Sequence, residues 1–373
     1  MKEIKEHTIS ARQACVIIVM CIFANKILLL PSLMYEKSKA DAIFAILILF
    51  ALDLIVLPIF FKLKQLFPNE KLYNILSRKI SPFLTKLIYL IFSAYFMFKA
   101  LLVFSVTYVY FKQQIYQDEF LFLAIIAFIP VINHATAVGL RSFARSIELL
   151  FSIVLLGFIA CLAFSLFTQL SMPIFFISNA KNFFTTIYEH TFAFGDYIFL
   201  FLIIDKIQIK KGQEKNFYFY SLLGMGLILA LFFLFYSKYQ ITSFMHNNAL
   251  ADILVFSVQF NAIGRLDIIA MLTVMVITLF QLEIYNYAFS ESFLSLFPKL
   301  NVYYSIAVFD ILFAILYYIF IGKYEILVGS SDIWSPVPAI FINYIIPLIC
   351  LIIILIELHL KKRKKKDQTY ISN

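Results

Sequence analysis

The stretch Phe23-Ala24-Asn25-Lys26-Ile27-Leu28-Leu29-Leu30-Pro31 interrupts an apolar run that is long enough to cross a membrane. The interruption places an amide and an ammonium group inside the run. A second interruption, Phe194-Gly195-Asp196, lies near the middle of another apolar run. Irregular backbone at membrane depth is tolerated only where it is buried in protein or lines a cavity. The two stretches therefore indicate a helical membrane protein with polar, non-helical segments buried near its centre.

The composition of the chain excludes several classes of protein. Of its 373 residues, 62% are apolar or aromatic and 14% are charged, whereas soluble domains have about 45–50% and about 25%. The mean hydropathy of +0.91 agrees with this difference. These values exclude an ordinary soluble enzyme, a disordered chain and a nucleic-acid-binding domain. We therefore expect no nucleic acid among the partners.

The apolar runs predict ten membrane-spanning helices, because each run is about 20 residues long and lacks the alternation of a β-barrel strand. The predicted spans are residues 13–34, 41–61, 83–111, 119–138, 142–168, 183–205, 216–237, 265–289, 301–322 and 337–359. The polar segment 69–80 is typical of a short surface helix, and 244–263 resembles another. The sequence thus predicts an all-α polytopic membrane protein.

The basic residues predict the orientation of these spans. With the N-terminus in the cytoplasm, 22 Lys and Arg side chains lie on the inner side and 7 on the outer side. Cytoplasmic loops carry such an excess, so most of the net charge of +9 reports topology. We expect both termini in the cytoplasm, in a multi-pass cell-membrane protein. The basic tail 361–373 is interpreted as a cytoplasmic stop signal, with binding to anionic membrane lipid or a partner as the alternative.

The positions of the two interruptions suggest an internal repeat. They fall in the first and sixth of ten spans, which are corresponding positions if the chain is a single transmembrane domain of two five-helix halves. Such broken helices are the sequence pointer to an inverted-repeat transporter fold, with a site between the repeats. We predict repeats over about 10–170 and 183–360. Half-helix N-termini there favour a carboxylate, because their free N–H groups carry partial positive charge.

Segments spread along the chain resemble a known family in their order and spacing. They are Ile9-Ser10-Ala11-Arg12-Gln13, Lys26 to Pro31, the basic loop Phe61 to Pro68 with Leu72-Tyr73-Asn74-Ile75-Leu76, Phe194-Gly195-Asp196, Ile263-Gly264-Arg265-Leu266-Asp267, Ser331-Asp332 and the basic end. On these segments the chain resembles the permease-like B subunits of spore germinant receptors. That family belongs to the amino acid–polyamine–organocation superfamily.

The resemblance implies a LeuT-like fold of ten helices with broken helices 1 and 6. It also implies a role in sensing small germinants, commonly amino acids, in the inner membrane of a dormant spore. The implied partners are an A-type subunit with cytoplasmic domains and a C-type lipoprotein subunit. The alternative function is a secondary amino-acid transporter of the same superfamily, and uptake in proteoliposomes distinguishes the two. A membrane-embedded enzyme is not expected, because no catalytic constellation is present.

The first interruption departs from the family pattern, which has glycines where this chain has Ala24, Asn25 and Lys26. Glycine lets a backbone unwind and approach a ligand closely. Either the ligand therefore differs from the usual amino acids, or Lys26 replaces part of the site. In one hypothesis Lys26 receives a substrate carboxylate and Asp196 receives its amino group; in the other the two form a direct salt bridge. The predicted substrate-binding residues are Ala24, Asn25, Lys26, Ile27, Phe194, Gly195 and Asp196.

Further polar residues at membrane depth are candidates for a pathway or for charge coupling, because ionisable groups there are expensive. Lys99 is either a fixed internal cation or the partner of Asp53, Glu283 or another buried acid. Glu148 is either a proton-coupling carboxylate or the local ion-pair partner of Arg145. Polar side chains that line a narrow pathway, or simply pack, are Tyr95, Glu283 and Tyr287.

The cysteine and histidine residues indicate neither a disulfide framework nor a metal site. Cys15, Cys21, Cys161 and Cys350 all lie inside apolar runs, where free thiols behave as small apolar side chains. The histidines have no metal-ligand spacing. We expect no cofactor and no metal.

Overall fold

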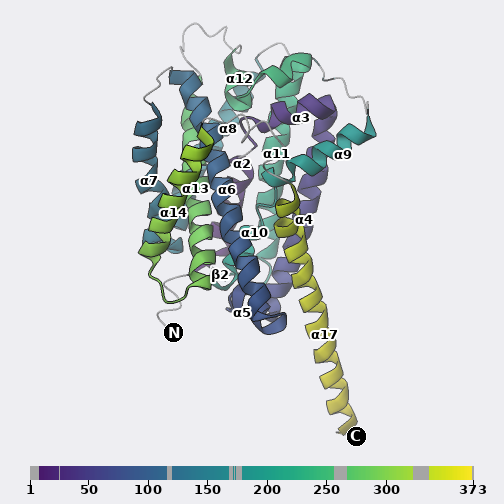
Figure 1. The fold of residues 1–373 in the computed structure, drawn as a ribbon. Helices are drawn as coiled ribbons and strands as arrows, with labels where there is room; N and C mark the ends of the chain where they lie inside the picture. The colour runs from purple at the N-terminus through teal and green to yellow at the C-terminus, as the bar shows by residue number, and fades with distance from the viewer. Residues whose placement is uncertain are drawn as a thin grey trace.

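A computed structural model describes residues 8–24, 26–115, 120–167, 171, 173, 179–255, 267–321 and 336–371. These residues form a bundle of helices, with one long helix at the C-terminal end that extends beyond it (Figure 1). Helices are the expected outcome, because a chain in lipid must satisfy its backbone hydrogen bonds within each segment.

Most long helices begin within a few residues of a predicted span, but several end beyond it. Up to residue 165 the helices are α2 (Ala11–Ala24), α3 (Leu30–Ser38), η1 (Lys39–Asp41), α4 (Ala42–Leu66), α5 (Leu72–Lys79), α6 (Pro82–Ile115), α7 (Phe120–Val138) and α8 (Leu140–Ser165). Beyond it they are α9 (Ala180–Glu189), η2 (His190–Ala193), α10 (Ile198–Leu202), η3 (Ile204–Lys206), α11 (Glu214–Tyr239), η4 (Gln240–Met245), α12 (Ala249–Val255), α13 (Asp267–Leu296), α14 (Val302–Ile321), α16 (Pro336–Ile340), the π-helix η5 (Phe341–Ile345) and α17 (Ile346–Ile371). Helices α4, α13 and α17 end at Leu66, Leu296 and Ile371, beyond the predicted ends at 61, 289 and 359.

Seven helical stretches among the described residues are long and apolar enough to cross a membrane, judged by length and composition. They are Leu30–Leu66, Pro82–Phe111, Leu140–Ser165, Glu214–Met245, Ile268–Leu296, Val302–Ile319 and Pro336–Leu360. The prediction of an all-α polytopic membrane protein is therefore confirmed. The predicted spans 13–34 and 183–205 each correspond to shorter helices, and 119–138 corresponds to α7. The predicted surface segment 69–80 contains the short helix α5.

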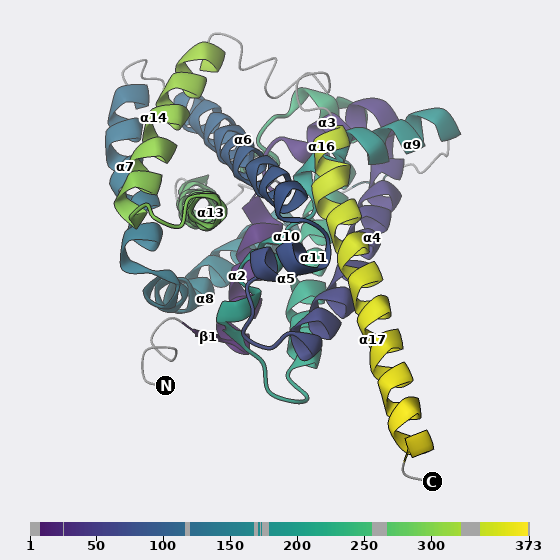
Figure 2. The ribbon, with the colours of Figure 1, turned by 60° about the horizontal axis from the view of Figure 1, so that its bottom comes forward.

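Helix α13 is the central element of the bundle. It packs against α2, α6, α7, α8 and α14, and its residues from Phe280 to Ser290 are all buried. Figure 2 shows α13 nearly end-on among α6, α7, α8 and α14, while α17 lies at one side with α4. A helix that is buried on every side needs internal partners for its polar side chains. The buried polar side chains of α13 are therefore candidates for functional residues.

A two-residue parallel ladder ties the start of α2 to the segment after α10. Strand β1 (Ile9–Ser10) pairs with β2 (Ile207–Gln208), with Ile9 opposite Ile207. Ser10 and Gln13 exchange backbone-to-side-chain hydrogen bonds of 3.0 and 3.3 Å, as in a capping box. The chain leading into the first interruption is thus fixed to the chain leaving the second.

Candidate functional site

The first interruption is a turn between two helices. Helix α2 ends at Ala24, residues 26–29 form a turn, and α3 begins at Leu30 with Pro31 in its first turn. The carbonyl groups of Ile27 and Leu28 accept hydrogen bonds of 3.0 and 3.1 Å from the backbone amides of Leu250 and Ala249. The start of α12 therefore supplies the donors that the interrupted helix lacks.

The second interruption is a sharp change of backbone direction between η2 and α10. Phe194 is extended, and Gly195 follows with a φ of 80°, a conformation that other residues adopt at a cost. A Cβ atom on Gly195 would lie 1.9 Å from Cγ of Asn343. Both the left-handed backbone and this close approach require glycine at residue 195.

Polar side chains from three other helices hold the peptide group between Phe194 and Gly195. The amide of Gly195 donates to both carboxylate oxygens of Asp53, each at 3.0 Å. The carbonyl of Phe194 accepts from Lys99 Nζ at 2.9 Å and from Asn343 Nδ2 at 3.2 Å. Tyr95 then donates to Asn343 Oδ1 at 2.9 Å. Every hydrogen-bonding atom of this peptide group thus has a buried partner.

A direct ion pair joins the two interruptions. Lys26 Nζ lies 2.7 Å from Asp196 Oδ2, and the two side chains are 0% and 1% exposed. Lys99 Nζ lies 3.5 Å from Asp196 Oδ1, and Lys26 also lies over the ring of Phe194, 4.7 Å from its centroid. Buried charges persist only when they are compensated. Asp196 meets this condition through two lysines from different helices.

We call this set of side chains the central cluster: Lys26, Asp53, Tyr95, Lys99, Asp196 and Asn343. Its two lysines and two aspartates carry no net charge when all four are ionised. All six residues are buried, although they come from segments up to 317 positions apart in the chain. The cluster is a compact, charge-balanced polar site enclosed by apolar helices.

The central cluster brings together some of the predicted site residues and separates others. The geometry of Lys26 and Asp196 is that of the direct salt bridge, and Lys99 pairs with the same aspartate. Ile27 contributes its backbone carbonyl, since its side chain is buried in the apolar core. Ala24 is the last residue of α2, and Asn25 lies outside the described residues.

The interpretation of Glu148 as the partner of Arg145 is wrong. Glu148 Oε1 lies 2.9 Å from Nε of Arg12 instead. Arg12 belongs to the first turn of α2, and the ladder of β1 with β2 sets the position of that turn. The spacing within α8 places Arg145 and Glu148 on one face of the helix, but the carboxylate of Glu148 pairs with Arg12 from α2.

The predicted pathway residue Tyr287 belongs to a different polar network from the central cluster. Tyr287 accepts a hydrogen bond of 2.7 Å from Lys206, and Lys206 also pairs with Glu291. Lys71 of the surface segment before α5 contacts the same glutamate at 3.2 Å. This second polar network lies beside β2. Glu283 is buried and makes no hydrogen bond or ion pair with any residue that the structure describes.

Two members of the central cluster were missed or left unassigned from the sequence. The sequence suggested Asp53 only as a possible partner of Lys99, whereas it accepts hydrogen bonds from the amide of Gly195. Its position within a predicted span was a signal, because such acids need a partner. Asn343 is an amide in the tenth apolar run and was not singled out. It lies on η5, and single turns of π-helix inside α-helices frequently mark functional sites.

Among the described residues no group of three or more His, Cys, Asp or Glu side chains could hold a metal ion. The four cysteines are buried. The central cluster itself is built from ammonium, carboxylate, amide and phenol groups.

Comparison with known proteins shows the family of the chain. No curated protein matches it. A family model described as "Spore germination protein" matches residues 8–325, which include both interruptions and most of the bundle. This match agrees with the resemblance that the sequence segments indicated. The chain belongs to the spore germination protein family, as a multi-pass membrane protein.

Proposed function

We propose that this chain is the permease-like B-type subunit of a germinant receptor and that it binds a small amino acid at the two interruptions. The observation that carries the proposal is the Lys26–Asp196 pair, which joins the interruptions at the centre of the bundle. An amino acid carries the same two charges as this pair. Its carboxylate suits Lys26, and its ammonium group suits Asp196.

The direct ion pair is the closed state in this proposal. A germinant shifts the equilibrium only if it binds an open state more tightly than the closed one. When the ligand separates Lys26 from Asp196, its carboxylate pairs with Lys26 and its ammonium group pairs with Asp196. The net charge of the site therefore stays at zero. Lys99 and Asn343 hold the neighbouring Phe194 carbonyl. A displacement of Asp196 is therefore transmitted to α6 and η5.

We further propose that the bundle has ten spans arranged as two inverted repeats over about 10–170 and 183–360. The pairs α2 with α3 and α9 with α10 then form the broken first and sixth spans. The helix bounds near the ten predicted runs support this arrangement, as does the excess of basic residues on one side. In this topology both termini are cytoplasmic, and residues 361–373 form a basic cytoplasmic tail.

The A-type and C-type subunits are the proposed partners, and the spore inner membrane is the proposed location, as the family implies. The B-type assignment predicts that the A-type and C-type subunits co-purify with this chain when the three are expressed together. Recovery of this chain without the other two, from cells that express all three, contradicts the assignment to a receptor complex.

A thermal-shift screen of the purified chain tests the ligand site. The active amino acid should raise the melting temperature, since binding at a concentration of 100 times Kd adds about 2.7 kcal/mol of stability. Its N-acetyl and methyl-ester derivatives each lack one charge and should fail. Lys26→Met should abolish the shift, whereas Lys37→Met, a change in a partly exposed ion pair with Glu189, should preserve it.

Three outcomes contradict parts of this proposal. A shift that survives in Lys26→Met places the ligand elsewhere. The absence of a shift with any amino acid, sugar or inorganic ion contradicts a ligand site in this chain. Gradient-driven accumulation of the amino acid in proteoliposomes shows a secondary transporter in place of a pure receptor.

A further inference from the structure

Glu283 is a buried acid near the middle of α13 that belongs to neither polar network. It is 4% exposed, and it makes no hydrogen bond or ion pair with any residue that the structure describes. The acids of the central cluster differ, because Asp53 accepts from the amide of Gly195 and Asp196 pairs with two lysines. A buried polar group without a partner is rare in folded proteins and needs an explanation.

The charged side chains on several helices packed against α13 have other partners. On α6, Lys99 lies 3.5 Å from Asp196. On α14, Asp310 accepts a hydrogen bond of 2.8 Å from Asn133 of α7. On α12, Asp252 accepts a hydrogen bond of 3.0 Å from a backbone amide. Each of these groups is thus held by a partner other than the buried acid of α13.

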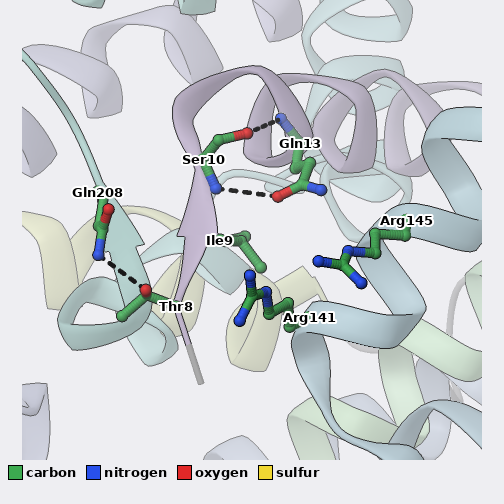
Figure 3. A pocket seen from close by; sticks show the side chains of 7 residues that line it. All are labelled: Thr8, Ile9, Ser10, Gln13, Arg141, Arg145 and Gln208. Carbon is green, nitrogen blue, oxygen red and sulfur yellow. Dashed lines mark hydrogen bonds between the residues drawn. The ribbon is translucent and has the colours of Figure 1, made fainter. Parts of the chain in front are cut away.

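The charges of α2 and α8 are also directed elsewhere. Arg12 of α2 pairs with Glu148 of α8 at 2.9 Å. The two arginines at the start of α8 line a pocket beside β1, and Figure 3 shows Arg141 and Arg145 extending toward that strand. The bases that remain among the described residues of α6 and α7 are exposed, namely Lys86 and His134. Since thiols and phenols are ordinarily uncharged near neutral pH, Glu283 has no counter-charge among the residues that the structure describes.

Burial without a counter-charge favours the neutral form of this carboxyl group. A buried carboxylate that lacks compensation costs far more than a neutral carboxylic acid, and such a group takes up a proton instead. The residues next to it in the helix, Leu282 and Ile284, are apolar and fully enclosed. Within membranes, buried acids mark proton relays as well as ion and substrate pathways, and the missing counter-charge indicates a proton.

The face of α13 that carries Glu283 leads to a polar network that reaches the surface. Phe280, Glu283 and Tyr287 are spaced by three and four residues and therefore share a face, and their exposed fractions are 6%, 4% and 7%. Fully enclosed residues lie on the other faces, namely Gln281, Leu282, Ile284 and Asn286. Tyr287 accepts a hydrogen bond of 2.7 Å from Lys206, whose side chain is 18% exposed. The least enclosed face of this stretch thus runs from the buried acid toward solvent.

We propose that Glu283 is a proton-binding site whose occupancy is coupled to the opening of the bundle. The site rests on the proposed function, which supplies the closed and open states. In the closed state the carboxyl group holds a proton. When the bundle opens and water reaches this face of α13, the O–H bond breaks, the proton passes to water and a hydrated carboxylate remains. Since linkage is reciprocal, a germinant that favours the open state binds more tightly as the pH rises.

Infrared spectroscopy of the purified full chain in lipid nanodiscs tests whether the acid carries a proton. At neutral pH, Glu283→Gln should remove the carbonyl band of one protonated carboxyl group. Glu148→Gln is the matched control, because it removes a carboxylate that is paired with Arg12, and it should remove a carboxylate band instead. If Glu283→Gln also removes a carboxylate band, Glu283 is ionised and the proposal is overturned. If Glu283→Gln does not fold, Glu283→Met supplies a neutral side chain of similar length; failure of both to fold, while Glu148→Gln folds, also overturns the proposal.

Amide hydrogen exchange of α13 at increasing pH, with no amino acid added, tests the coupling. At each pH the exchange rate of residues 280–290 in the wild type is divided by the rate in the neutral variant, which removes the intrinsic pH dependence of exchange. This ratio should rise by up to about tenfold per pH unit, because opening releases one proton, and Glu148→Gln should follow the wild type. A ratio that stays constant overturns the coupling. Because no ligand is present, failure of the amino-acid site would leave this result unchanged, so the two failures are distinguishable.

Discussion

Removing the ammonium group of Lys26 should destabilise the protein more than most single substitutions. At an effective dielectric constant of about 20, the Coulomb attraction between Lys26 and Asp196 at 2.7 Å is about 6 kcal/mol. That between Lys99 and Asp196 at 3.5 Å is about 5 kcal/mol. These gross attractions offset the desolvation of the charges. Lys26→Met leaves Asp196 with one partner and gives the central cluster a net negative charge.

The expected loss in the free energy of unfolding for Lys26→Met is about 3–5 kcal/mol, the usual cost of breaking a buried pair. Lys26→Met combined with Asp196→Asn restores neutrality, with Lys99 and Asp53 as the remaining charges. This double variant should therefore recover most of the loss. Lys37→Met, in a partly exposed pair, should lose less than about 1 kcal/mol.

Thermal unfolding of the purified variants, followed by fluorescence, measures these differences. The yield of each variant in the membrane is a second measurement. The order of stability should be wild type, then Lys37→Met, then the double variant, and last Lys26→Met. If Lys26→Met is as stable as Lys37→Met, the pair is not a compensated buried charge. If the double variant is less stable than Lys26→Met, charge balance is not what holds the central cluster together.

Three other substitutions test different parts of the structure. Gly195→Ala should lower the free energy of unfolding by about 2–5 kcal/mol, because alanine at a φ of 80° is strained and its Cβ would clash with Asn343. An unchanged melting temperature refutes this backbone geometry. Glu148→Gln removes the exposed pair with Arg12 and should change stability by less than about 1 kcal/mol, so a larger loss shows a role beyond that pair. Asp252 lies in α12, and burial raises the pKa of its carboxyl group to about 6. Its protonated form therefore stabilises the fold fully below about pH 4, and this stabilisation is lost as the pH rises through 6. Asp252→Asn should remove this dependence, at most about 3 kcal/mol, and an identical pH profile of melting temperature contradicts it.

Local sequence predicted the helices well, because the length of an apolar run and its polar borders are local properties. Most predicted runs begin within a few residues of an observed helix, although α17 continues twelve residues past the predicted end at 359. The two interruptions fall between helices, at residues 24–30 and 194–196. Gly195 was recognised as a break for a local reason, since a glycine beside an aspartate inside an apolar run disfavours a regular helix.

Partners across the bundle were harder to predict. Helical spacing suggested Arg145 for Glu148, and the actual partner is Arg12 from another helix. The sequence did not indicate a role for Asn343, because an amide in an apolar run does not predict which residue it contacts. Its contact with the Phe194 carbonyl exists only because η5 packs against the second interruption.

By itself the sequence determined a helical membrane protein, the places where its first and sixth apolar runs break, and the family to which it is similar. The tertiary structure alone decided that Lys26 meets Asp196 directly, that Asp53 and Asn343 complete the central cluster, and that Glu148 pairs with Arg12. The physical reason is that burial and charge compensation act between side chains far apart in the chain. Apolar length and helix interruption act within a few turns.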